Sequence, residues 1–195
     1  MAILENCVRF ALTEQILSKA NHFSCGNSDL DEFFSKDAIT YAQQLMGKTY
    51  VFIDTEHPQD ILCAFTVSNA SIFTNYLPNS RKKKIGHTVP QDKRDLIYPA
   101  VLIGRLGVNQ SFHHKHIGSD LMDYIKTWFT NDENKTGCRY LVVDAYNDTN
   151  ARSYYERNGF QYMFSSEEQE KQYRKISNAD PLRTRMMYFD LIQVI

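Results

Sequence analysis

The chain has few of the residues that mark specialised protein classes. Its 195 residues include only four cysteines, five prolines and one tryptophan. The cysteines are too sparse for a disulfide scaffold and are not paired at metal-ligand spacing, so we expect reduced, mostly buried thiols. No apolar run approaches about 20 residues, the length that spans a membrane, and the N-terminus has no cleavage-like site. We therefore expect a cytoplasmic protein with no membrane partner.

A strong charge of either sign is also missing, since the formal net charge is −1. This balance gives no global bias towards nucleic acid. Hydrophobic residues make up 43% of the chain, enough for a sizeable core in one domain spanning residues 1–195. Residues 75–95 break the pattern and include the basic run Arg81–Lys84, so we interpret them as an exposed insertion. A basic run usually forms a solvated face, and its functional alternative is a contact to phosphate.

Short apolar runs alternate with stretches of helical spacing along the chain. The predicted strands are Cys7–Leu12, Lys48–Asp54, Ile61–Val67, Tyr98–Val108, Cys138–Ala145, Phe160–Phe164 and Arg185–Leu191. Helices are predicted for residues 13–17, 30–45, 117–129 and 147–158, and residues 165–183 are helix or loop. Strands alternating with helices indicate an α/β fold, and the early hairpin around His57-Pro58 indicates a mixed sheet.

The most informative stretch is a buried strand followed by a polar loop and a helix. Tyr98–Val108 is apolar enough to be covered on both faces, whereas Asn109–His116 is polar and cannot continue the strand. Four apolar residues then recur every four positions from Ile117 to Phe129, which predicts one apolar helix face. The first amides of such a helix have no intrahelical partner and favour a phosphate. Gly118, in the first turn, leaves the backbone open to a ligand.

This stretch resembles motif A of the GNAT family of N-acetyltransferases. In that motif a strand is followed by a pyrophosphate-binding loop of the form Gln/Arg-x-x-Gly-x-Gly/Ala. Here Leu106–Val108 matches the strand segment, and His113 falls at the Gln/Arg position. His116 falls at the first glycine and Gly118 at the second, so only Gly118 keeps the pattern.

A second stretch, VVDAYNDTNARSYYERNGFQY, resembles the motif B region of the same family. The family pattern is a strand and then a helix of the form Ala-x-x-Phe/Leu-Tyr-x-x-x-Gly-Phe. The matching residues, in order, are Ala151, Tyr154, Tyr155, Gly159 and Phe160. Asp148 departs from the asparagine usual three residues before the alanine. Two motifs in the family's order are more specific than either motif alone.

The resemblance implies a GNAT-like mixed, largely antiparallel central sheet with a splayed parallel strand pair and helices on both faces. It also implies acetyl-CoA as cosubstrate, without a metal. The implied cofactor-binding residues are Leu106, Gly107, Val108, His113, His114, Lys115, His116, Ile117, Gly118 and Ser119. A substrate amine would attack the thioester directly, and Tyr155 would act as general acid towards the leaving thiolate. A tyrosine hydroxyl can donate this proton without being ionised at neutral pH; packing in the core is its structural alternative.

Two further groups of side chains have several interpretations. Asp144, at the end of a predicted strand, is a candidate general base, but a turn or helix-capping role is the alternative. The run His113-His114-Lys115-His116 has poor geometry for closing a tetrahedral metal site within one loop. Its imidazoles either face solvent, while the backbone binds the ligand, or contact the pyrophosphate together with Lys115.

The acceptor of the acetyl group is not specified by these motifs. Phe23-x-Cys25-Gly26 followed by Leu30-Asp31-x-Phe33-Phe34 resembles a GNAT subgroup that includes toxins acetylating aminoacyl-tRNA. A capped amphipathic helix packed in the core explains the same residues. We therefore predict an N-acetyltransferase acting on an amine, either a small molecule or an aminoacyl group. The alternatives are a toxin of a toxin–antitoxin system, with tRNA as partner, and a non-catalytic CoA-binding module. A homodimer is compatible with each of these.

Overall fold

The computed structural model describes residues 6–87, 89, 97–113, 115–134 and 136–195. Its strands form one sheet in the order β1-β2-β3-β4-β5-β7-β6, mostly antiparallel with a parallel β4–β5 pair. The strands are β1 Cys7–Ala11, β2 Lys48–Asp54, β3 Ile61–Phe73, β4 Ile97–Val108, β5 Tyr140–Tyr146, β6 Gln161–Tyr162 and β7 Thr184–Asp190. The α-helices are α1 Glu14–Lys19, α2 Ser28–Glu32, α3 Ala38–Gln43, α4 Asn79–Ile85, α5 Ile117–Thr130, α6 Thr149–Arg157 and α7 Glu167–Arg174. This arrangement confirms the predicted fold class.

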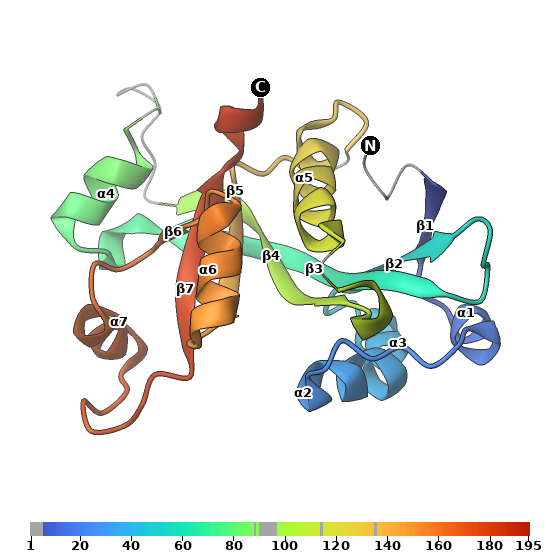
Figure 1. Cartoon of the computed structure of the whole chain (residues 1–195). Coiled ribbons are helices and arrows are strands. Elements are labelled where there is room, and N and C mark those ends of the chain that lie inside the picture. Colours follow the sequence, from blue (N-terminus) through green and yellow to red (C-terminus); the bar gives the residue numbers. More distant parts are fainter. Residues whose placement is uncertain (1–5, 88, 90–96, 114, 135) are drawn as a thin grey trace. The chain divides into compact units, whose positions relative to one another are not determined.

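The chain divides into two compact units. The first comprises Met1–Asn69 and Ile103–Trp128, and the second comprises Ala70–Leu102 and Phe129–Ile195. Within the first unit, α1–α3 lie on one face of β2 and β3, and α5 lies on the other face (Figure 1). The guanidinium of Arg9 on β1 lies 4.1 Å from the centre of the Trp128 ring on α5, a cation–π contact between strand and helix.

The second unit is centred on β5 and β7, which pair antiparallel from Tyr140–Asp190 to Tyr146–Thr184. Helix α6 lies against β5 (Figure 1). The hydrophobic core of the second unit joins residues from α4, the sheet and the loops beside them. These residues are Ile72, Leu77, Ile85, Tyr98, Ala100, Tyr140, Met163, Phe164 and Tyr188. The Tyr140 hydroxyl donates a hydrogen bond to the Ile85 carbonyl (2.7 Å), which fixes the end of α4 to the sheet.

The sequence-based boundaries are confirmed for β2 and α5, including the buried face of α5 from Ile117 to Phe129. Burial of β4 on both faces is limited to its centre, Ala100–Ile103, because the residues after Ile103 alternate in exposure. The expected strand Phe160–Phe164 is wrong in length, since only Gln161–Tyr162 pair with β7.

One other expectation needs correction. The helix predicted up to Leu45 is broken by the π-helical turn Phe33–Asp37, and Leu45 is 90% exposed with a positive φ of 58°. The segment interpreted as an exposed insertion, residues 75–95, is described only in part. It contains α4, whose Ile85 is buried, while Lys93 and Arg94 lie outside the described residues.

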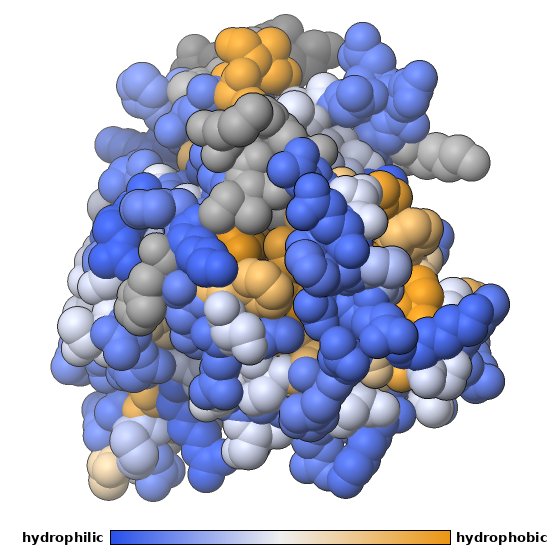
Figure 2. Space-filling view, turned by 45° about the vertical axis from the view of Figure 1, so that its right-hand side comes forward, coloured by the Kyte–Doolittle hydropathy of each residue, from blue (hydrophilic) through white to orange (hydrophobic). Residues whose placement is uncertain are grey.

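Polar and charged residues dominate the face seen in Figure 2, with apolar residues in groups between them. The four cysteines are free thiols, and only Cys63 is fully buried. Within the described part of the chain, no helix has the length and apolar character needed to cross a membrane.

Candidate active site

Asn109 fixes the loop that follows β4. Its backbone N–H donates to the Leu62 carbonyl (2.8 Å), and its side-chain amide donates to the Ile61 carbonyl (3.1 Å). Its side-chain oxygen accepts from the Ser111 N–H (3.1 Å), which starts the turn Gln110–Phe112. Sequence reasoning placed Asn109 only in a polar loop. The asparagine after the strand could have indicated this turn, because an asparagine side chain often accepts a hydrogen bond from the backbone N–H two residues later.

The segment Phe23–Gly26 packs directly on the end of β4. A Cβ at Gly107 would lie 2.9 Å from the Cys25 Cβ, so this close approach requires glycine. The Gln110 N–H donates to the Ser24 carbonyl (2.8 Å). The Asp31 carboxylate accepts from the Cys25 N–H and the Ser24 hydroxyl (both 2.7 Å). The two stretches that resemble the family signatures are therefore in contact within the first unit, and the N-terminal stretch supports the loop.

The His113 side chain has a structural contact within the histidine-rich loop. The His113 ring turns back onto the strand, where its Nε2 donates to the Val108 carbonyl (2.9 Å). The Lys115 ammonium lies 5.1 Å from the centre of the Phe112 ring. His114 lies outside the described residues. His113 therefore holds the strand–loop junction, which the sequence pattern did not indicate.

His116 has a left-handed backbone, with φ of 62°. This conformation costs an ordinary residue about 1–2 kcal/mol and glycine almost nothing. His116 stands where the family motif has its first glycine, the residue that adopts a left-handed backbone most readily. Its carbonyl accepts from the N–H groups of Ser119 (3.0 Å) and Asp120 (3.1 Å), which begins α5.

Three consecutive amides at this junction are open. The N–H groups of Lys115, His116 and Ile117 donate to no residue that the structure describes. In contrast, the His113 N–H donates to Gln110 (3.1 Å) and the Ser119 N–H donates to His116. Successive amides that include a left-handed residue, at the positive end of a 14-residue helix, favour an anion. The N–H groups of His113 and Ser119, at the two ends of the predicted pyrophosphate-binding span, are thus already used within the chain.

The strain at His116 gives a testable expectation. His116→Gly should keep or raise the stability of the fold by up to about 1 kcal/mol, because glycine adopts this φ without a Cβ penalty. His116→Val should lower it by at least about 1 kcal/mol, because a β-branched residue is an outlier at positive φ. Urea denaturation of both variants measures the difference. Equal stability of the glycine and valine variants would contradict a strained His116.

Tyr155 lies on α6, in the second unit. Asp148 caps this helix by accepting from the Ala151 N–H (2.9 Å), and Gly159 ends it with a φ of +80°. The Tyr155 ring packs against the rings of Tyr154 (5.1 Å between centroids) and Phe160 (5.4 Å). No described residue hydrogen-bonds to its hydroxyl. Burial raises the pKa of Tyr155 above its ordinary value, so the hydroxyl keeps its proton at neutral pH.

Asp144 is held in an ion pair. The Arg174 guanidinium on α7 donates to its carboxylate, and Arg174 also contacts Glu170. The structure thus favours the structural role over a general base. Among the described residues, no group of three or more His, Cys, Asp or Glu side chains is placed to hold a metal.

Residues 81–162 match the family model for the acetyltransferase (GNAT) domain. Residues 81–162 therefore resemble a GNAT acetyltransferase domain. This range contains both motif stretches, from β4 to Tyr155, and the match confirms the predicted enzyme class, an acyltransferase.

Solved structures with a similar fold include toxins of this family. A tyrosine-to-phenylalanine mutant of KacT is 17% identical, with a TM-score of 0.69 over 97% of this chain and 99% of that one. AtaTR bound with acetyl-CoA is 15% identical, with a TM-score of 0.65 over 97% and 96%. AtaT complexed with acetyl-methionyl-tRNAfMet is 15% identical, with a TM-score of 0.64 over 96% of each chain. At these identities the likeness shows the fold alone.

Proposed function

We propose that this protein is an acetyl-CoA-dependent N-acetyltransferase that binds the pyrophosphate of acetyl-CoA on the amides of Lys115–Ile117. The observation that carries the proposal is the run of three open amides at the start of α5, beside the left-handed His116. Such amides bind phosphate without needing cationic side chains. The similarity to a GNAT structure bound with acetyl-CoA supports the same ligand.

The pantetheine arm would extend along the edge of β4. The Asn109 N–H faces β3, so the alternation of a strand turns the backbone groups of Leu106 and Val108 to the opposite edge. The Val108 carbonyl already accepts a hydrogen bond from the His113 ring. An amide of the pantetheine arm must therefore bond to other backbone groups of β4 or displace that imidazole. Gly107 lies against Cys25, where a Cβ would come within 2.9 Å of the Cys25 Cβ.

The chemical step joins the acceptor nitrogen to the acetyl group. The neutral amine attacks the thioester carbonyl, and the tetrahedral intermediate breaks its C–S bond. Tyr155 gives its proton to the sulfur as CoA leaves, and the new amide nitrogen loses a proton to water. A hydroxyl without a hydrogen-bond partner among the described residues is free to donate in this way.

Gly118→Trp is expected to abolish acetyl-CoA binding, because an indole in the first turn of α5 would occupy the space next to the open amides. Isothermal titration with acetyl-CoA measures the loss. Gly137→Trp is the matched control, since a side chain at Gly137 meets nothing within 4 Å. Wild-type affinity in Gly118→Trp would show that the pyrophosphate lies elsewhere.

We propose the amino group of an aminoacyl-tRNA as the more specific candidate for the acetyl acceptor. The supporting observation is the fold shared with AtaT, a protein solved in complex with acetyl-methionyl-tRNAfMet. AtaT has also been solved bound to the C-terminus of the antitoxin AtaR, which makes an antitoxin the corresponding partner candidate here. Acetyl transfer to aminoacyl-tRNA, compared with deacylated tRNA and free amino acids, tests this acceptor.

A further inference from the structure

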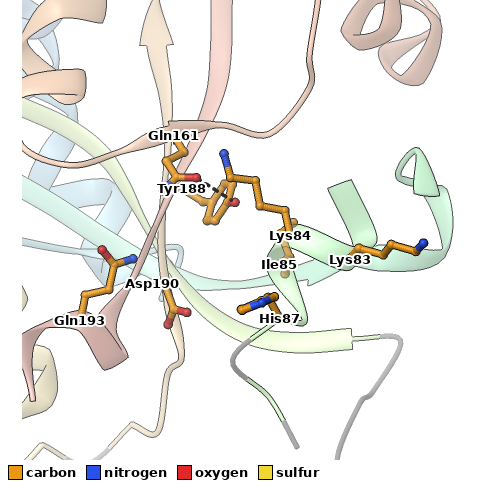
Figure 3. Close-up of a pocket in the computed structure, with 8 residues that line it drawn as sticks. All are labelled: Lys83, Lys84, Ile85, His87, Gln161, Tyr188, Asp190 and Gln193. Carbon is orange, nitrogen blue, oxygen red and sulfur yellow. Dashed lines mark hydrogen bonds between the residues drawn. The ribbon is translucent and has the colours of Figure 1, made fainter. Parts of the chain in front are cut away.

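A pocket of about 390 Å³ lies in the second unit, and none of the residues that line it is assigned above to acetyl-CoA (Figure 3). One wall comes from the end of α4 and the residues after it, and the other from β6, β7 and the C-terminal turn. The lining residues are Lys83, Lys84, Ile85, His87, Gln161, Tyr188, Asp190 and Gln193. The volume is within the range of small-ligand pockets.

The charges in the pocket are unbalanced. Neither Lys83 nor Lys84 has a carboxylate partner among the described residues. The one acid in the lining, Asp190, is already neutralised by Arg139, with contacts of 2.6 and 3.0 Å. Lys84 reaches towards Tyr188 and Gln161, whereas Lys83 extends away from them (Figure 3). The pocket therefore presents an uncompensated positive charge, with Lys84 as its central cation and Lys83 at the rim.

Neutral hydrogen-bonding groups surround this cation. The Gln161 side-chain oxygen accepts from the Tyr188 hydroxyl (3.4 Å), which leaves its NH₂ group available. The Gln193 amide and the His87 ring have no partner among the described residues. Amide and imidazole groups around a cationic pocket suit a ligand that has both a phosphate and a polar heterocycle.

The basic run Arg81–Lys84 divides into two parts with different roles. The Arg81 Nε donates to the Ser165 hydroxyl (3.0 Å), and Lys82 does not line the pocket. Ile85 is buried and its carbonyl is held by Tyr140, so α4 presents Lys84 from a fixed position. A diffuse solvated face would not place the last two lysines of the run, Lys83 and Lys84, along a formed pocket.

We propose that this pocket binds one nucleotide of an RNA, with its phosphate at Lys84 and its base edge at Gln161 and Gln193. The inference rests on the proposed function, because the RNA would be the one that carries the aminoacyl acceptor. Lysine supplies the phosphate contact as a point charge, and the glutamine amides supply hydrogen bonds to the base.

The test is the binding of a labelled single-stranded RNA oligonucleotide by fluorescence anisotropy, without acetyl-CoA. Lys84→Ala should weaken binding about tenfold or more, as expected for loss of a charged hydrogen bond. Lys82→Ala removes the same charge from the same helix but lies outside the pocket, so it should weaken binding less than about threefold. Gln193→Ala should weaken binding without changing its salt dependence, because a glutamine neutralises no phosphate. Thermal melting verifies that each variant is folded.

If Lys84→Ala and Lys82→Ala weaken RNA binding equally, the proposed RNA site in the pocket is wrong and the binding is diffuse electrostatic attraction to the helix. Tight binding of free cytidine monophosphate but not of the oligonucleotide would overturn the assignment to RNA. Displacement of the RNA by an acidic peptide with the same net charge as the oligonucleotide would overturn it as well. Since the assay contains no acetyl-CoA, its failure is distinguishable from failure of acetyl transfer, which is measured with small amines.

Discussion

Replacing Tyr155 with phenylalanine is expected to lower kcat by about 10²–10⁴-fold while leaving the affinity for acetyl-CoA nearly unchanged. General acid catalysis is typically worth that factor, and the hydroxyl acts on the leaving thiolate only in the transition state. Because burial raises the pKa of Tyr155, its proton is lost only above the ordinary tyrosine value of about 10. The wild-type rate should therefore show no fall caused by Tyr155 as the pH rises from 7 to 9.

Tyr154→Phe is the matched control, since it removes the same hydroxyl from the neighbouring position of α6. Steady-state kinetics of both variants, with acetyl-CoA affinity measured by calorimetry, separates catalysis from binding. An unchanged rate in Tyr155→Phe, or an equal loss in Tyr154→Phe, would remove Tyr155 from the chemistry and favour its alternative role in packing.

Glu170→Ala is expected to lower the free energy of unfolding by about 3–5 kcal/mol, the usual cost of leaving buried charges without a partner. Glu170 is completely buried on α7. Its carboxylate accepts from Arg185 (2.8 Å), Arg174 (2.8 Å) and the Met186 N–H (2.7 Å). Removing it takes away the counter-charge that the two arginines share and the hydrogen bond from the Met186 N–H of β7 to α7.

Glu168→Ala, on the exposed face of the same helix, should change the stability by less than about 0.5 kcal/mol. Glu170→Gln should fall between the two, since it keeps the shape and loses the charge. Urea denaturation followed by circular dichroism measures all three. A loss in Glu170→Ala no larger than that in Glu168→Ala would contradict the buried carboxylate clamp.

The strand–loop–helix unit was predictable because its signal is periodic. Apolar residues from Ile117 to Phe129 recur at helical spacing, and the loop residues cannot be buried. The left-handed backbone at His116 was not predictable from its residue type, since histidine usually avoids positive φ. Only the family pattern, which has glycine there, pointed to it.

Other features depend on contacts that no local pattern encodes. The sequence Glu167–Arg174 is polar throughout, so nothing in it indicates that Glu170 is the buried carboxylate. The pocket at Lys84 likewise combines residues from α4, β6 and β7 that are far apart in the chain. Arg174, which pairs with Asp144, lies 30 residues away from it in the chain. Such pairings are fixed by tertiary packing rather than by propensity.

The most direct measurement is the release of free CoA from acetyl-CoA by the purified wild-type protein, with small amines and aminoacyl-tRNA offered as acceptors. We expect CoA to be released above background with at least one acceptor, and the acetylated amine to be detected by mass spectrometry in equal amount. Binding of acetyl-CoA without release for any acceptor would point to a non-catalytic CoA-binding module. Absence of both binding and release would contradict an acetyl-CoA-dependent acetyltransferase.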